Sequence, residues 1–179
     1  MEPKDNLALN AARKGSKELL RYADEVDKLD VIEKGPTDYV TELDKRVERL
    51  IINDLKKAYP KHSYLSEEVW LEEGKGTGVN SLWIIDPLDG TTNYIHGFPV
   101  YCVSIALKIK GRLELAVIYD PSRQELFTAI RGMGSLLDGR RIRVSKQSTL
   151  EGALLGTGFH YRQKMDWLNV YLEILSEFS

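Results

Sequence analysis

The most constraining feature of the sequence is an apolar run that ends in two closely spaced aspartates. Residues 82–85 are all apolar, and Asp86, Pro87, Leu88 and Asp89 follow directly. A short continuous apolar run is typical of a strand that is buried on both faces. Such a strand carries Asp86 to the edge of a sheet, where Asp89 lies in a tight turn. Two carboxylates this close together repel each other unless a cation lies between them.

The oxygen donors of this segment suit a hard divalent cation. The carboxylates of Asp86 and Asp89, with the backbone carbonyl of Leu88 between them, are ligands of the kind that Mg²⁺ accepts. The same donors also suit Mn²⁺. The sequence therefore predicts a divalent metal site at the end of this strand.

The residues after the aspartates predict a phosphate site. Gly90 and Thr91 begin a helix, and amides at a helix N-terminus bind phosphate oxygens. The segment contains no Lys or Arg, so the metal must provide the positive charge. Carboxylates, metal and amides together indicate metal-assisted hydrolysis of a phosphoester. Thr91 offers a hydroxyl to orient water, and Glu67 or Glu68 offers a base.

The order of the expected elements indicates an α+β domain, with an antiparallel sheet packed by helices. Apolar residues recur every three or four positions over 5–29 and over 41–59, which predicts two amphipathic helices. Residues 30–38 carry a loop signal that includes Gly35-Pro36. Strands of a meander are expected over 100–109, 113–119 and 125–129, with turns at 110–112, 120–123 and 138–139.

The remaining segments give weaker signals. An extended run is expected at 63–65, a glycine-rich surface loop at 71–81, one more strand within 152–158 and a last helix from Met165 to Phe178. Cys102 lies in an expected strand and is interpreted as a small core residue.

Composition excludes several classes of protein. The chain of 179 residues has 25 Lys and Arg against 27 Asp and Glu, a net charge of −2 that implies no global attraction to nucleic acid. One cysteine cannot form an intramolecular disulfide. The N-terminus lacks the apolar core of a signal peptide, and no stretch is long enough to span a membrane. These features predict a cytoplasmic protein without membrane contact.

The segment from Asp86 to Asn93 resembles the metal-binding signature of the inositol monophosphatase family. Three further segments are similar in order and spacing. They are Lys34–Asp44, like the family's lysine-bearing loop and following helix, Ser66–Glu68, like its metal-ligand glutamate, and Tyr119–Gly134, like its sheet hairpins. The resemblance covers essentially the whole chain. It implies that residues 1–179 form the N-terminal, metal-binding domain of a bacterial member.

The resemblance implies a role for each matching residue. Glu67, Asp86 and the Leu88 carbonyl would hold one Mg²⁺, and Asp86 would bridge to a second Mg²⁺ shared with Asp89. Thr91, working with Glu67, would orient the attacking water.

Other residues would bind the substrate or support the metal site. The amides of Gly90 and Thr91 would bind the substrate phosphate, and Asp89 would also contact the substrate. The supporting residues would be Asp44, Glu68 and Lys34.

Each supporting residue also has a simpler interpretation. Asp44 is a plausible capping acid for the helix over 41–59, Glu67 and Glu68 are plausible loop charges, and Lys34 is a plausible surface charge. Likewise, a basic hairpin around Arg140, Arg141, Arg143 and Lys146 fits either a solvated face or an anionic partner.

The resemblance also implies what lies outside the chain. Family members continue into a second α/β domain, whose Trp-Asp motif completes the second metal site. This sequence contains no Trp-Asp dipeptide. The chain is therefore expected to represent the first half of the fold.

The expected function is release of phosphate from myo-inositol 1-phosphate, by a protein that the resemblance suggests is a homodimer. Another sugar phosphate, a nucleotide phosphate or histidinol phosphate is an alternative substrate. A different class of function is also open. Some bacterial relatives join transcription antitermination complexes with RNA polymerase and Nus factors, so the chain could be a non-catalytic interaction domain.

Overall fold

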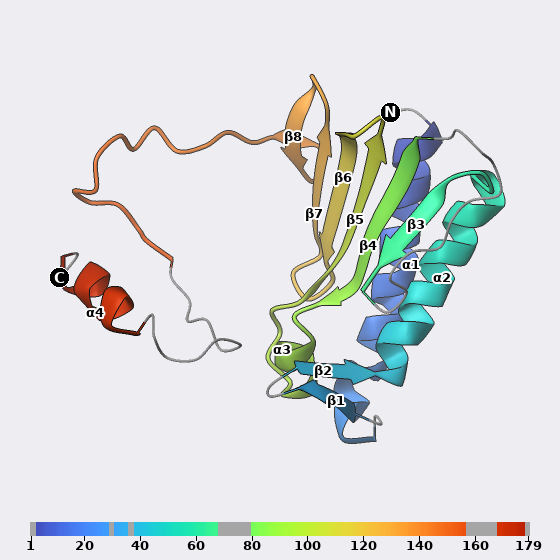
Figure 1. Ribbon diagram of the computed structural model, residues 1–179, viewed down its shortest axis with the longest axis horizontal. Coiled ribbons are helices and arrows are strands. Elements are labelled where there is room, and N and C mark those ends of the chain that lie inside the picture. The colour runs from blue at the N-terminus through green and yellow to red at the C-terminus, as the bar shows by residue number, and fades with distance from the viewer. Residues whose placement is uncertain (1–2, 29–30, 36–37, 68–79, 157–167, 178–179) are drawn as a thin grey trace.

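A seven-stranded sheet forms the centre of the molecule, in the order β3-β4-β5-β6-β7-β8-β9 (Figure 1). The computed structural model describes residues 3–28, 31–35, 38–67, 80–156 and 168–177. The strands of the sheet are β3 (Ser63–Ser66), β4 (Ser81–Asp89), β5 (Cys102–Ile109), β6 (Arg112–Asp120), β7 (Glu125–Ile130), β8 (Gly134–Leu137) and β9 (Arg140–Arg141).

The meander expected over 100–129 is confirmed in β5, β6 and β7. The structure extends it from β4 to β9, because each of these strands pairs antiparallel with the next. The edge strand β3 is the exception and runs parallel to β4. A parallel pair needs a long connection, and the chain between Ser66 and Ser81 provides one. The α+β class is therefore confirmed, with a mixed rather than purely antiparallel sheet.

Two long helices, α1 (Pro3–Tyr22) and α2 (Glu42–Ala58), cover one face of the sheet (Figure 1). The helix predicted over 41–59 agrees with α2 to within one residue at either end. The prediction of one helix over 5–29 is too long, because α1 ends at Tyr22 and a 3₁₀ segment, η1 (Ala23–Lys28), follows it. The backbone of Glu25, at φ −125° and ψ 22°, leaves the helical region.

The loop expected over 30–38 is wrong. Strands β1 (Val31–Gly35) and β2 (Asp38–Thr41) form a separate two-stranded antiparallel sheet. Their β-branched and aromatic residues favour extended backbone. The glycine signal at Gly35 marks only the end of the first strand.

The core lies between the two helices and the sheet. Its largest fully buried side chains include Trp83 and Tyr64 from the sheet and Leu19 and Ile51 from the helices. Gly15 allows α1 and α2 to approach closely, since a Cβ there would lie 2.9 Å from Cγ1 of Val47.

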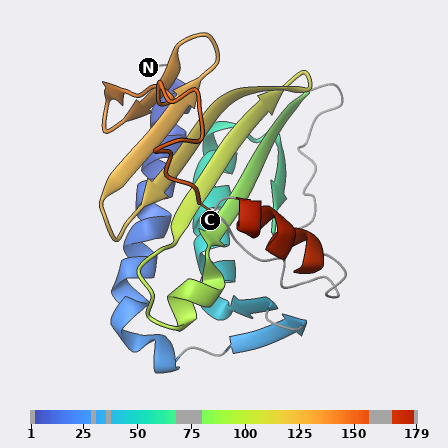
Figure 2. The same cartoon turned by 90° about the vertical axis from the view of Figure 1, so that its left-hand side faces the viewer.

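The opposite face of the sheet is only partly covered. In β4, Trp83 and Ile85 are buried against the helices, whereas Leu82 and Ile84 on the other face are half-buried. The prediction of a strand buried on both faces is therefore wrong, because helices pack on one side alone. On the other side lies α4 (Leu168–Glu177), which has no buried residue (Figure 2).

Two hairpin turns follow the predicted chemistry. Lys110-Gly111 and Asp138-Gly139 each join neighbouring strands with positive φ at both residues, as two-residue turns require. The strand expected within 152–158 is absent from residues 152–156, and residues 157–158 lie outside the described part. The loop expected at 71–81 lies almost wholly outside it as well. None of the described helices is both long and apolar enough to cross a membrane.

Candidate functional site

An irregularity at the end of β4 positions the two aspartates. Asp86 is paired with Ser104 of β5 and Asp89 with Cys102, and the register shifts between these two pairs. Such a bulge bends a strand and redirects its side chains. The amide of Leu88 donates to Oδ1 of Asp86 at 3.2 Å, which fixes that carboxylate against the bulged backbone.

Thr91 connects this strand end to the helical layer. Its Oγ1 lies 3.2 Å from Oδ1 of Asp44 and 3.0 Å from the carbonyl oxygen of Leu88. Asp44 comes from the first turn of α2 and is 3% exposed, so a carboxylate is held in the core beside the site. The single hydroxyl proton of Thr91 can be donated to either acceptor.

The turn that presents Thr91 depends on a glycine. Gly90 precedes α3 (Thr91–Ile95) and has φ +97°, in the left-handed region. A Cβ at this position would lie 2.8 Å from the carbonyl oxygen of Val100. The turn is therefore open only to glycine.

Tyr94 anchors the same turn to α1. Its buried hydroxyl donates to the carbonyl oxygen of Leu19 at 2.7 Å, and its ring packs edge-to-face on Tyr101 at 4.9 Å. Burial raises the pKa of the Tyr94 phenol, so it stays a neutral donor. The short helix that begins at Thr91 is thus held by both long helices.

The electrostatics of the site centre on Asp86. The pKa of this carboxyl is raised to about 7, chiefly by burial and then by the neighbouring charges of Glu67 and Asp89, with a smaller effect from Asp44. The hydrogen bond from the Leu88 amide acts in the opposite direction. Three carboxylates thus act on Asp86 at the end of β4, as expected for a site that binds a cation.

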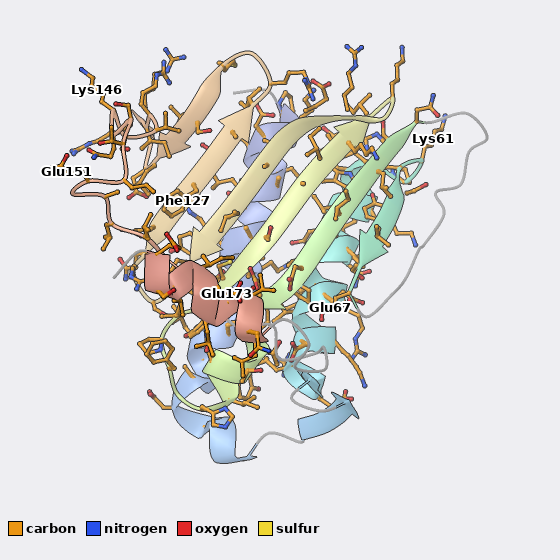
Figure 3. The ribbon with its side chains drawn as sticks, turned by 60° about the vertical axis from the view of Figure 1, so that its left-hand side comes forward. Lys61, Glu67, Phe127, Lys146, Glu151 and Glu173 are labelled. Atoms are coloured by element: carbon orange, nitrogen blue, oxygen red, sulfur yellow. The ribbon has the colours of Figure 1, made fainter. Side chains whose placement is uncertain are left out.

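Glu67 reaches this place through the parallel strand. It directly follows Ser66, the partner of Ile85 in β4, and it is exposed. Figure 3 shows Glu67 below the end of β3, at the same end of the sheet as α3. The neighbouring Glu68 lies outside the described residues. Lys34 lies in β1, but its side chain is likewise outside the described part.

Cys102 belongs to this region, although the sequence had suggested a core position. It is half-buried on the face opposite the helices, and its Sγ lies 3.8 Å from Oδ2 of Asp89. Burial, followed by the charges of Asp89 and Asp86, raises the pKa of this thiol to about 12. The alternation of β5, with Val103 inward, was the signal that would have placed it correctly.

The donors present are chemically suited to Mg²⁺, although the structure contains no ready-made cage. Among the described residues, no three Asp, Glu, His or Cys side chains form a group arranged to hold one ion. The carboxylates of Glu67, Asp86 and Asp89 and the carbonyl of Leu88 are nevertheless hard oxygen ligands. The raised pKa of Asp86 shows negative charge that a cation would compensate.

The comparisons with known proteins identify a family. The sequence profile of the inositol monophosphatase family matches residues 1–178. A Pseudomonas aeruginosa protein named Nus factor SuhB is 53% identical over 175 residues, which are 97% of this chain and 65% of that protein. The chain thus spans just under two thirds of the length of this relative.

Solved structures share the fold. The extragenic suppressor protein SuhB of Bartonella henselae superposes with a TM-score of 0.88 at 42% identity, over 97% of this chain and 65% of the other. An IMPase/NADP phosphatase complexed with Mg²⁺ and phosphate gives a TM-score of 0.59 at 28% identity, over 70% of this chain and 48% of the other.

Proposed function

Since the chain belongs to the inositol monophosphatase family, we propose that it carries the metal-binding half of a Mg²⁺-dependent phosphomonoesterase site. The observation that supports this most strongly is the convergence of Glu67, Asp89 and Asp44 on the half-buried Asp86, whose pKa is raised by its partial burial and by these charges. A related structure that contains Mg²⁺ and phosphate supports the choice of ion.

Glu67, Asp86 and the Leu88 carbonyl would hold one ion, and Asp86 and Asp89 a second. Bound Mg²⁺ would lower the pKa of a coordinated water and offset the charge of the phosphate. The other groups that the proposed reaction needs, which orient water, accept a proton and contact the substrate, are residues of the chain.

Thr91 is the residue best placed to orient the attacking water. Its hydroxyl donates to Asp44 or to the Leu88 carbonyl, which leaves its lone pairs to accept a hydrogen bond from water. Glu67 would accept the proton that this water loses. The bulged, glycine-dependent turn holds Thr91 in place, which reduces the reorganisation that the reaction requires.

The amides of Gly90 and Thr91 and the Asp89 carboxylate would contact the substrate. We take myo-inositol 1-phosphate as the substrate, because the family suggests it. Another sugar phosphate, a nucleotide phosphate or histidinol phosphate would place the same phosphoryl group at the same residues.

Because the chain spans only 65% of the length of its relative, the test measures Mg²⁺ binding as well as phosphate release. Purified chain is titrated with Mg²⁺ by calorimetry and assayed for phosphate release from myo-inositol 1-phosphate. Asp89→Asn should abolish Mg²⁺-dependent release and weaken Mg²⁺ binding. Glu151→Gln, which removes one exposed negative charge outside the site, should leave both unchanged. Equal activity of Asp89→Asn and the parent chain would refute the mechanism.

A second function has more direct support from the names of relatives. The Pseudomonas protein at 53% identity is named a Nus factor, and we propose that this chain also contacts a Nus factor or RNA polymerase in a transcription antitermination complex. Binding to purified polymerase and Nus factors should survive Asp89→Asn if this role is independent of catalysis. Loss of binding in that variant would tie the two roles to one site.

A further inference from the structure

A groove of about 630 Å³ lies between α1 and α2, and none of its lining residues belongs to the candidate site. Four of the seven lining residues are cations and one is a carboxylate. The cations are Lys14, Lys17, Arg21 and Arg46, and the carboxylate is Glu18. The groove therefore has a strongly positive rim on a chain whose net charge is −2.

Two of these cations are already paired. Nη2 of Arg46 lies 2.6 Å from Oε1 of Glu18, and Nζ of Lys14 lies 2.6 Å from Oδ2 of Asp54. Within the described part of the chain, Lys17 and Arg21 make no ion pair.

Lys17 and Arg21 stand four residues apart on α1. Like charges at this spacing repel each other and slightly destabilise a helix. An anionic partner would remove this repulsion, so these two positions are where a ligand gains most from charge complementarity.

The groove also has apolar surface. Leu20 is 44% exposed and Leu50 is half-buried, and both line it. A partner that fits must therefore combine carboxylates with apolar side chains. An amphipathic helix with acidic residues beside its apolar face has this composition, and such helices bind in grooves.

An aromatic ring beside the groove, in contact with two of its lining arginines, argues against single-stranded nucleic acid as the ligand. The guanidinium carbons of Arg21 and Arg46 each lie 5.6 Å from the ring centroid of Tyr22. Arg46 also donates to the Tyr22 hydroxyl at 3.1 Å. Because guanidinium groups already occupy this ring, no free aromatic face is presented for a base to stack on.

We propose that the groove between α1 and α2 docks an acidic amphipathic helix of a partner protein. Carboxylates of that helix pair with Lys17 and Arg21, and an apolar side chain of it contacts Leu20 and Leu50. The inference rests on the groove alone and holds whether or not the chain binds Mg²⁺.

The test uses the full chain and a fluorescein-labelled helical peptide with leucines on one face and glutamates on the other. Two further probes are the same peptide with serine in place of leucine and an oligouridylate of equal charge. The groove variant is Lys17→Glu with Arg21→Glu. Its matched control is Lys61→Glu with Arg112→Glu, which makes the same charge change at exposed positions outside the groove.

We expect saturable binding of the leucine peptide that weakens with salt. The groove variant should raise its Kd about tenfold, whereas the control should change it less than about twofold. Leu20→Gln should raise the Kd about threefold by removing apolar contact. Circular dichroism should show equal helicity in all variants, since the substituted side chains are exposed.

Three results would overturn the proposal. The groove variant and the control could weaken binding equally, which would make the attraction nonspecific. The serine peptide could bind as tightly as the leucine peptide, which would remove the role of the apolar surface. The oligouridylate could bind more tightly than the peptide and displace it, which would make the groove a nucleic-acid site.

Discussion

The two faces of the central sheet are built from the same strands, but they differ in how deeply their side chains are buried and in the groups they carry. On the face covered by α1 and α2, residues such as Val103, Ile105 and Leu107 are at most 1% exposed. On the opposite face, Ile84 is half-buried and Ile118 is 41% exposed. The candidate site lies where Asp86 projects from this open face, beside residues that the covered face holds in place.

The covered face contributes mainly to stability, whereas the open face carries groups of the candidate site. The covered face holds the large apolar side chains whose burial drives folding. The open face carries Asp86 and Cys102, whose pKa values are shifted, at the same end of the sheet. Substitutions on the first face should therefore change the free energy of unfolding, and substitutions on the second should change ion binding.

The largest expected effect compares two neighbouring isoleucines of β4. Ile85→Ala on the covered face should lower the free energy of unfolding by about 3 kcal/mol, because it leaves a cavity in packed core. Ile84→Ala on the open face should cost about 1 kcal/mol, because that side chain is already partly in water. Urea unfolding followed by Trp fluorescence measures both, and equal losses would show that the faces do not differ.

A second comparison tests how tightly the surrounding structure constrains the backbone of the turn at Gly90. Gly90→Ala should cost about 2 kcal/mol, because it places a side chain at positive φ against the Val100 carbonyl. Gly111→Ala is the matched control, with φ +78° and open space around the new Cβ, and should cost about 1 kcal/mol. A loss at Gly90 no greater than at Gly111 would contradict a tightly held turn.

The charge on the open face predicts a pH dependence. The pKa of Asp86 is about 7 in the folded chain, above its ordinary value of 3.8. Its contribution to the stability of the metal-free protein is therefore fully present below about pH 4 and is lost as the pH rises through 7. Asp86→Asn should flatten this part of the profile, as measured by urea unfolding without metal.

Mg²⁺ binding should follow the opposite trend, because the ion competes with the proton on Asp86. Affinity measured by calorimetry should rise as the pH increases towards 7 and level off above it. An affinity that stays constant from pH 5 to 8 would exclude Asp86 as a ligand.

The smallest effect is expected at the edge of the covered face. Nε1 of Trp83 donates to Nδ1 of His62 at 3.0 Å, a bond that needs this histidine nitrogen unprotonated. Burial lowers the pKa of His62 below its ordinary value of 6.5. The bond should therefore persist at neutral pH and be lost as the pH falls through that lowered pKa, with a small loss of stability.

The indole N–H resonance of Trp83 in an NMR spectrum reports this step. His62→Gln is the control, since its side chain offers an acceptor that does not titrate in this range. A resonance in the parent chain that stays fixed down to pH 4 would rule out the assigned hydrogen bond.

Local signals predicted much of the fold. The apolar periodicity of α2 and the glycine turns at Gly111 and Gly139 are properties of neighbouring residues, so the sequence shows them directly. The parallel pairing of β3 and the hairpin of β1 and β2 depend on which strands meet. No local pattern contains that information, so these features were missed.

The same distinction between local signals and contacts of distant residues applies to the candidate site. The aspartates of β4 were visible because they follow one another in the chain, and the structure brings Glu67 and Asp44 to them. The contact between Thr91 and Asp44 joins residues 47 positions apart, and it was not predicted. The family resemblance named Asp44 only as a supporting residue of the metal site. Cys102 was misplaced because its exposure depends on which face of the sheet the helices cover.

The tethering of α3 has a consequence for how the sequence can diverge. Thr91 is bound to α2 through Asp44, and Tyr94 is bound to the Leu19 carbonyl of α1. A shift of either long helix would move the turn between Asp89 and Thr91. Positions 44 and 91 are therefore expected to change together over evolutionary time, and Tyr94 requires the backbone of α1 to keep its place, so that selection on this turn also constrains both long helices.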